Sequence, residues 1–175
     1  NSSKTLLSGN LINNFMETGK NVLWIQTNYG LDRLDLKKTT SQSFVEFKDN
    51  RFMTKSKDNE LFTLKDDGYF YYYQQEKGTF RKLEVPQPAF EYILSTTIDA
   101  NNILWVFTSN NDNRSYQINK TKEGLSLTPN HLFKHSEKLR WAFPEGQLVY
   151  FIDETYSLYE YDFNNQQQYF IADLK

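Results

Sequence analysis

Short apolar stretches of strand length recur along the whole chain, and turn-forming residues such as Gly, Asn and Asp separate them. In the clearest block, apolar stretches at 11–16 and 22–27 flank a Gly-Lys-Asn turn at 19–21, and a third stretch at 31–35 follows Asn-Tyr-Gly at 28–30. β-branched and aromatic residues favour strands, whereas Gly and Asn favour tight turns. The block therefore predicts three antiparallel strands joined by two hairpins.

The same block recurs three more times. Each copy has a large aromatic residue at the same place in its second predicted strand, at intervals of about 40 residues, the length of one propeller blade; these residues are Trp24, Phe62, Trp105 and Tyr150. A polar hairpin and a fourth predicted strand follow each third strand, at 44–47, 79–83, about 125–127 and 168–171. Four antiparallel strands in each unit indicate a propeller blade.

We therefore predict an all-β fold, a β-propeller of four-stranded antiparallel blades. About four blades are present, at 10–48, 51–85, 89–133 and 138–172, within a single propeller segment that spans 1–175. Aromatic residues make up 17% of the chain. Because blades pack face to face, we expect these side chains to fill the wedges between them.

Both ends of the sequence look like cuts in a longer chain, so we expect a segment of a larger propeller. An open arc of four blades would expose an apolar face at each end. We therefore expect these faces to pack against the remaining blades of the same protein or to cause self-association.

Charge and composition exclude several partners. The net charge is −2 and the charges are interspersed, so we expect this segment to bind no nucleic acid. The absence of cysteine excludes disulfides, thiolate metal sites and a cysteine nucleophile. No apolar run approaches the roughly 18 residues of a membrane helix, so we expect no membrane insertion by this segment. No glycine-rich phosphate-binding loop is present, and we expect no cofactor.

Residues 21–35 and 99–108 resemble the two-component regulator propeller repeat, whose pattern is an acidic turn, Asn, Leu-Trp-Ile and Thr, followed by Gly-Leu and an apolar residue with Asp. The second copy departs from the pattern at Phe62 and Lys65, and the fourth lacks the Gly-Leu. The resemblance implies the periplasmic sensor region of a membrane-bound, often hybrid, sensor histidine kinase of Bacteroides type, which detects oligosaccharides. The kinase would then lie elsewhere in the full protein, an inner-membrane protein with this part outside the cytoplasm.

Glycoside hydrolysis needs at least two acids, so paired carboxylates are candidate catalytic residues. The candidate pairs are Asp66 with Asp67, Asp153 with Glu154, and Asp32 with Asp35. The first two pairs lie at predicted turns, where Asp commonly bonds its own backbone.

The histidines and serines point no more strongly to catalysis. His131 and His135 share one face of an extended segment, but no third zinc ligand is evident. No Gly-x-Ser-x-Gly motif occurs. We expect no catalytic residue and no metal site, and thus no enzyme activity in this segment.

Binding is the favoured interpretation, because binding residues concentrate on loops above a rigid scaffold. Turns between second and third strands open on the same face of a propeller as the connections between blades. The candidate ligand-binding residues on these turns are Asn28, Tyr29, Asp66, Asp67, Asn111, Asp112 and Arg114. Ordinary turn chemistry is the alternative for each of them. For the function, the alternatives are a carbohydrate-active propeller enzyme and a scaffold that docks protein partners.

Overall fold

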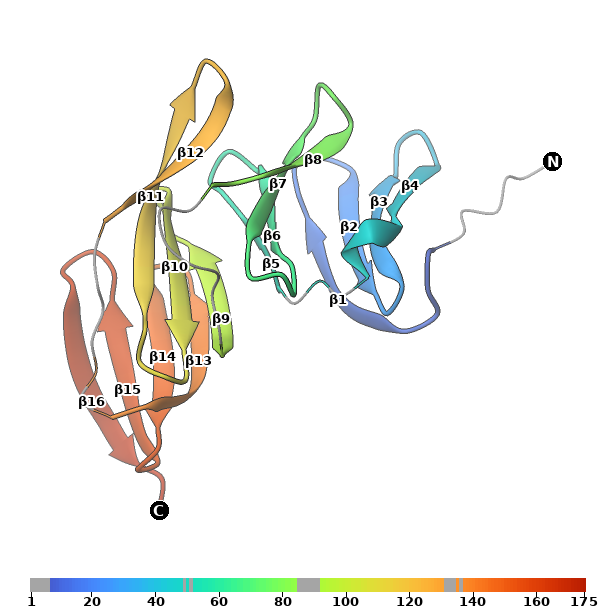
Figure 1. Cartoon of the computed structure of the whole chain (residues 1–175). Coiled ribbons are helices and arrows are strands. Elements are labelled where there is room, and N and C mark those ends of the chain that lie inside the picture. Colours follow the sequence, from blue (N-terminus) through green and yellow to red (C-terminus); the bar gives the residue numbers. More distant parts are fainter. Residues whose placement is uncertain (1–6, 49, 51, 85–91, 131–134, 136) are drawn as a thin grey trace. The chain divides into compact units, whose positions relative to one another are not determined.

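The computed structural model describes residues 7–48, 50, 52–84, 92–130, 135 and 137–175. It contains four separate four-stranded antiparallel sheets, each a meander whose spatial order follows the sequence (Figure 1). The predicted all-β architecture of four-stranded blades is confirmed. No helix of the described residues is long and apolar enough to cross a membrane.

The chain forms two compact units. Unit 1 spans Asn1–Lys82 and holds the first two blades. Blade 1 consists of β1 (Ile12–Glu17), β2 (Val22–Thr27), β3 (Gly30–Asp35) and β4 (Thr40–Phe44), followed by a 3-10 turn, η1 (Val45–Phe47). Blade 2 consists of β5 (Phe52–Lys55), β6 (Leu61–Leu64), β7 (Phe70–Gln74) and β8 (Thr79–Lys82).

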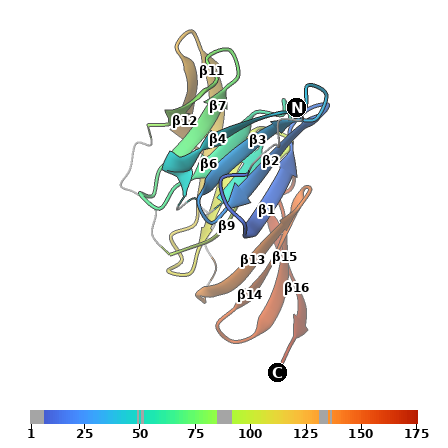
Figure 2. The ribbon, with the colours of Figure 1, turned by 90° about the vertical axis from the view of Figure 1, so that its right-hand side faces the viewer.

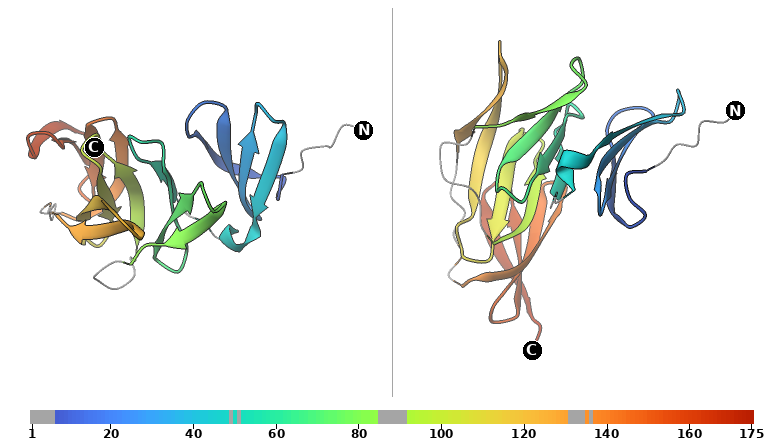
Figure 3. Two further views of the ribbon diagram at one scale, coloured as in Figure 1. Left: turned by 90° about the horizontal axis from the view of Figure 1, so that it is seen from above. Right: turned by 45° about the vertical axis from the view of Figure 1, so that its right-hand side comes forward.

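Unit 2 spans Leu83–Lys175 and holds the other two blades. Blade 3 consists of β9 (Ile93–Ile98), β10 (Ile103–Thr108), β11 (Arg114–Thr121) and β12 (Gly124–Pro129). Blade 4 consists of β13 (Leu139–Glu145), β14 (Leu148–Asp153), β15 (Ser157–Asp162) and β16 (Gln167–Asp173). Figure 2 shows the four strands of blade 4 side by side, and Figure 3 shows the twist of the individual sheets.

The fourth strand of blade 1 corrects the sequence-based prediction. Residues 44–47 were expected to form it, but the strand is Thr40–Phe44 and Val45–Phe47 form the 3-10 turn. The polar strand residues 40–43 are all exposed and carry no hydrophobic signal. The apolar signal comes from Phe44 and Phe47, which are buried because both belong to the core of unit 1.

The second-strand aromatic residues anchor the packing within each unit. Trp24 is 1% exposed, and its ring contacts Tyr73 of blade 2 edge to face at 4.8 Å. Trp105, also 1% exposed, stacks on Phe163 of blade 4 at 4.6 Å. Burial of a side chain of this size stabilises the fold by roughly 2–3 kcal/mol. In both units this aromatic residue therefore points toward the following blade.

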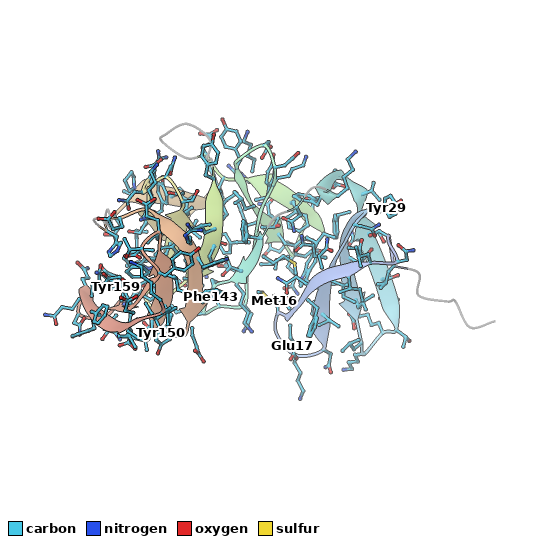
Figure 4. All side chains as sticks on the ribbon, turned by 90° about the horizontal axis from the view of Figure 1, so that it is seen from below. Met16, Glu17, Tyr29, Phe143, Tyr150 and Tyr159 are labelled. Carbon is cyan, nitrogen blue, oxygen red and sulfur yellow. The ribbon has the colours of Figure 1, made fainter. Side chains whose placement is uncertain are left out.

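Tyr150 holds the equivalent place in blade 4 but is only half-buried, which departs from the expectation of a buried position. The neighbouring residues Val149 and Phe151 face the core shared with blade 3, so Tyr150 lies on the opposite face of the sheet. Phe143 pairs directly with Tyr150 (Figure 4) and is 53% exposed. Trp141 on the same face is 46% exposed. This outer face of blade 4, defined by Trp141, Phe143 and Tyr150, remains an exposed aromatic surface.

Candidate functional site

In blades 1, 3 and 4, one additional backbone hydrogen bond lies just outside the ladder that pairs the first two strands. It joins the turn after the second strand to the residue leading into the first strand. The N–H groups of Asn28, Ser109 and Glu154 donate to the carbonyls of Leu11, Tyr92 and Lys138, at 3.1, 2.9 and 2.8 Å. Each second-to-third strand turn is thereby fixed beside the start of its own blade.

In unit 2, two such corners form the walls of a pocket. Its cavity volume is about 440 Å³, and its lining residues are Tyr92, Ser109, Asn110, Lys138, Leu139, Arg140 and Glu154. One wall comes from the start of β9 and the β10–β11 turn, and the other from the start of β13 and the β14–β15 turn. The volume lies within the range of small-ligand sites.

The pocket collects charged side chains. Two cations, Lys138 and Arg140, line it together with one carboxylate, Glu154. No ion pair within the described residues involves Lys138 or Glu154. The guanidinium of Arg140 lies 4.6 Å from the centre of the Tyr156 ring, a cation–π contact that holds this side chain in place. The pocket can therefore offer both hydrogen-bond donors and an acceptor to a ligand.

Two tyrosines at this site have a strained backbone. Tyr92 has φ +54° and Tyr156 has φ +65°. Bulky side chains rarely adopt such values, and residues of this kind cluster at binding and active sites. Tyr92 is also 64% exposed, so its ring is available to a ligand.

The predicted residues of unit 2 follow the pocket residues Ser109 and Asn110, with Asn111 and Asp112 in the β10–β11 turn and Arg114 at the start of β11. Their side chains contact one another or the backbone. Arg114 donates from Nε to Asp112 at 2.8 Å and makes a second hydrogen bond from its terminal nitrogen. Burial alone would lower the pKa of Arg114, but the hydrogen bond to Asp112 and the negative charge of Asp112 raise it. Asn111 donates to the backbone carbonyl of His135.

The predicted residues of blade 1 share one turn. Asn28 is half-buried, and its Oδ1 accepts a hydrogen bond from the backbone of Leu11 at 3.3 Å. Tyr29 is 59% exposed (Figure 4). The backbone N–H of Tyr29 donates to Thr27 Oγ1 at 3.2 Å, and this hydrogen bond does not involve the phenol ring.

The predicted residues of blade 2 lie in the β6–β7 turn. Asp66 is exposed. Asp67 accepts hydrogen bonds from the Tyr69 backbone at 3.0 Å and from the Tyr71 hydroxyl at 2.7 Å. Partial burial and this hydrogen bond raise the pKa of Tyr71 to about 12. Asp67 therefore stabilises its own turn. The predicted residues thus lie at two turns of unit 1 and, separately, at one turn of unit 2.

The candidate catalytic pairs hold structural positions. Asp153 is fully buried and accepts hydrogen bonds from Thr155 and Ser157, and its Oδ2 lies 3.2 Å from His135 Nε2. Only its neighbour Glu154 lines the pocket, so the two carboxylates do not flank one open space.

The pair of Asp32 and Asp35 is structural too. Asp32 is fully buried and accepts hydrogen bonds from Ser8 and Ser43. Asp35 accepts backbone hydrogen bonds from Lys38 and Lys37, and that from Lys38 is the main cause of its lowered pKa.

Metal ligation finds no support in the described ranges, which contain no group of three His, Cys, Asp or Glu side chains placed to hold an ion. His135 is buried, with Nδ1 3.2 Å from Gln168 Oε1, and its ring packs against Phe151 and Tyr159. His131 lies outside the described residues.

Sequence reasoning missed most of the pocket. Tyr92, Ser109, Asn110, Lys138 and Arg140 were not among the predicted binding residues. The available signal was register, because residues leading into a first strand lie beside the turn that follows the second strand. Both blades contribute to the pocket only because they pack together, and the sequence does not show how they pack.

No family model matches the sequence, and no curated protein matches it. Solved structures do resemble it. The extracellular domain of a Bacteroides thetaiotaomicron protein named as a hybrid two-component system matches 93% of this chain with a TM-score of 0.66 at 13% identity. Virginiamycin B lyase from Staphylococcus aureus matches with a TM-score of 0.61 at 13% identity. PorZ, a surface component of the type-IX secretion system of Porphyromonas gingivalis, matches with a TM-score of 0.61 at 16% identity. Each of these two matches covers 93% of this chain.

These likenesses show the fold. The chain spans 56% of the length of the lyase, 21% of PorZ and 25% of the two-component protein's domain.

Proposed function

We propose that this chain is a ligand-sensing segment of the extracytoplasmic region of a two-component sensor kinase and that it recognises an oligosaccharide. The repeat resemblance at 21–35 and 99–108 supports the sensor assignment, as does the fold shared with the extracellular domain of a protein named as a hybrid two-component system. The observation that carries the proposal is the unit 2 pocket, whose Lys138 and Glu154 have no ion-pair partner among the described residues.

The chemistry of the pocket suits a sugar. Saccharides present hydroxyl groups to polar side chains and an apolar ring face to aromatic ones. Ser109 and Asn110 supply polar groups, and Tyr92 supplies an exposed ring. Small-ligand sites commonly combine apolar surface with a few polar groups in this way.

The enzyme alternative receives less support, although one structural neighbour is a lyase. A glycosidase needs two carboxylates around the scissile bond. Glu154 is the one carboxylate among the described residues that line the pocket, and Asp153 beside it is enclosed by hydrogen bonds. This arrangement favours binding over hydrolysis.

Calorimetry of the 175-residue chain against a panel of neutral and acidic oligosaccharides, paired with thermal melts, tests the proposal. We expect saturable binding by at least one saccharide, weakened about fivefold or more by Tyr92→Ala with little change in melting temperature. Phe15→Ala is the control, because Phe15 is 68% exposed in the middle of β1. Absence of binding by every saccharide at millimolar concentration would refute the proposal for this segment.

The same calorimetry also tests two residues that were predicted from the sequence, Tyr29 and Arg114. If Tyr29 and Arg114 contact the ligand, Tyr29→Ala and Arg114→Ala should each weaken binding, and Tyr29→Ala should leave the fold intact. Arg114→Ala also leaves Asp112 without its bidentate partner, so its thermal melt must be compared with the wild type before its affinity is interpreted. Unchanged affinity in both variants would limit the site to the residues that line the pocket.

A further inference from the structure

We infer that the unit 2 pocket binds a carboxylated saccharide, with the carboxylate at Lys138 and Arg140 and a sugar ring on Tyr92. This inference rests on the proposed function and narrows its ligand class. Among the described residues, two cations and one carboxylate line the pocket, although the whole chain has a net charge of −2. A local excess of positive charge in an acidic protein favours an anionic ligand.

The backbone of Lys138 and the side chain of Arg140 are held in place independently of any ligand. The carbonyl of Lys138 accepts the 2.8 Å hydrogen bond from Glu154 N–H, which ties the start of β13 to the β14–β15 turn. Arg140 stacks over the Tyr156 ring at 4.6 Å. The backbone of Tyr156 is held in turn, because its N–H donates to Asp153 at 3.1 Å and its carbonyl accepts from Leu174 at 2.9 Å. A guanidinium that is already oriented loses less entropy when it binds.

The guanidinium favours a carboxylate in particular. Its planar fork matches the two oxygens of a carboxylate, and stacking on an aromatic face leaves the edge of the fork available for such a bidentate pair. Lys138 adds a second positive charge from the same segment. Glu154 lies on the same wall, and its carboxylate would repel a second acidic group but can accept a hydrogen bond from a sugar hydroxyl.

The opposite wall supplies a surface for the sugar ring. Tyr92 is 64% exposed and has a strained backbone, with φ +54°. The N–H of Ser109 donates a 2.9 Å hydrogen bond to the carbonyl of Tyr92, which stabilises this conformation. Asn110 follows in the same turn and adds an amide that can both donate and accept. A uronic acid residue has the features that these two walls recognise, a carboxylate, hydroxyl groups and an apolar ring face.

Trigalacturonate and its fully methyl-esterified form make a matched pair of probes, because esterification removes the charge and keeps the sugar rings. With the 175-residue chain, we expect trigalacturonate to bind at least about tenfold more tightly than the ester, and less tightly as the NaCl concentration rises. Lys138→Gln and Arg140→Gln should each weaken trigalacturonate binding about three- to tenfold and weaken ester binding by a smaller factor. Lys122→Gln, an exposed residue between β11 and β12, is the charge-matched control and should change neither.

Three results would overturn the inference. Equal affinity for the acid and the ester would show that the carboxylate is not recognised, and equal losses in Lys122→Gln and Lys138→Gln would show a nonspecific charge effect. In both cases saccharide binding that depends on Tyr92 would leave the proposed function standing. Failure of trigalacturonate to bind while a neutral oligosaccharide binds would also refute the inference alone, whereas failure of every saccharide refutes the proposed function as well.

Discussion

The indole N–H of Trp105 donates a 3.0 Å hydrogen bond to Oδ2 of Asp99, and both residues are almost fully buried, at 1% and 2% exposure. Trp24 makes the equivalent bond to Thr18 Oγ1 at 2.9 Å, again to a residue six positions earlier. A buried indole N–H without an acceptor would cost about 1–3 kcal/mol. The polar residue in the turn before the second strand therefore allows a tryptophan to fill the space between blades.

Asp99→Ala should destabilise the chain by about 1–3 kcal/mol. Besides the indole, the Asp99 carboxylate accepts the backbone N–H groups of Asn101 and Ile103, both at 2.9 Å, so the substitution leaves three donors unpaired. Denaturant unfolding measures the change, with Asp66→Ala in an exposed turn as the control. A loss below about 0.5 kcal/mol, the usual range for surface substitutions, would show that the bond is dispensable.

The first hairpins of the blades depend on a residue in the left-handed conformation. Asn21, Asn59 and Asn102 have φ values of +69°, +60° and +59°, and Gly146 has +61° in blade 4. Asn59 is exposed, so its substitution tests the backbone alone. We expect Asn59→Ala to cost about 1 kcal/mol and Asn59→Gly to be nearly neutral, because only glycine reaches this region without a penalty from Cβ.

Thermal melts of these two variants, with Lys57→Ala in the same turn as the control, give the comparison. Equal melting temperatures for the alanine and glycine variants would contradict the assigned conformation.

Stability should fall at acidic pH through Asp153. Burial acts to raise the pKa of Asp153, but hydrogen bonds from the Thr155 hydroxyl, the Ser157 N–H, His135 and the Thr155 N–H outweigh it, and the net pKa is lowered. A carboxylate with a lowered pKa in the folded state stabilises the fold above its unfolded-state pKa. This contribution is lost as the pH falls below about 4 and passes through the folded-state pKa.

Asp153→Asn should therefore be less stable than the wild type near neutral pH, and the difference should shrink toward about pH 2. Free energies of unfolding measured across this range test the prediction, with Asp66→Asn as the exposed control. A difference between Asp153→Asn and the wild type that stays constant with pH would show that the Asp153 charge contributes nothing.

The outer face of blade 4 should drive association of the isolated chain. We propose that it packs on a second copy, because Trp141 and Phe143 are 46% and 53% exposed and burial of apolar surface stabilises a complex by about 25 cal/mol per Å². Sedimentation velocity should show oligomers at about 0.1 mM. Trp141→Ser with Phe143→Ser should give monomers, whereas Leu36→Ser, at another exposed apolar residue, should not. A wild-type chain that stays monomeric would contradict this role.

The repeat could be predicted from sequence because each blade places a bulky residue at the same strand position, as Trp24 and Trp105 show. Tyr150 follows the same spacing yet is half-buried, because burial depends on whether a neighbouring blade covers that face. The prediction of a strand at 44–47 was wrong because residues 40–43 of the observed strand are polar and exposed.

The pocket was less accessible to sequence reasoning. The pairing of β13 with β14 predicts that Lys138 and Glu154 lie together. Their approach to Tyr92 depends on the packing of two blades, for which local patterns give no signal. The turn residues that were predicted are present at the expected turns, but Asp67, Asp112 and Arg114 make hydrogen bonds within their own turns.

Ligand binding at the unit 2 pocket is tested most directly by an NMR titration of the isotope-labelled 175-residue chain with trigalacturonate. Binding at the pocket predicts saturable shifts of the backbone amides of Tyr92, Ser109, Asn110 and residues 138–140 and 154, with amides in the middle of β1 and β7 unchanged. Shifts confined to other regions would contradict binding at the pocket. The absence of shifts with trigalacturonate, its methyl ester and neutral oligosaccharides, each at millimolar concentration, would contradict ligand sensing by this segment.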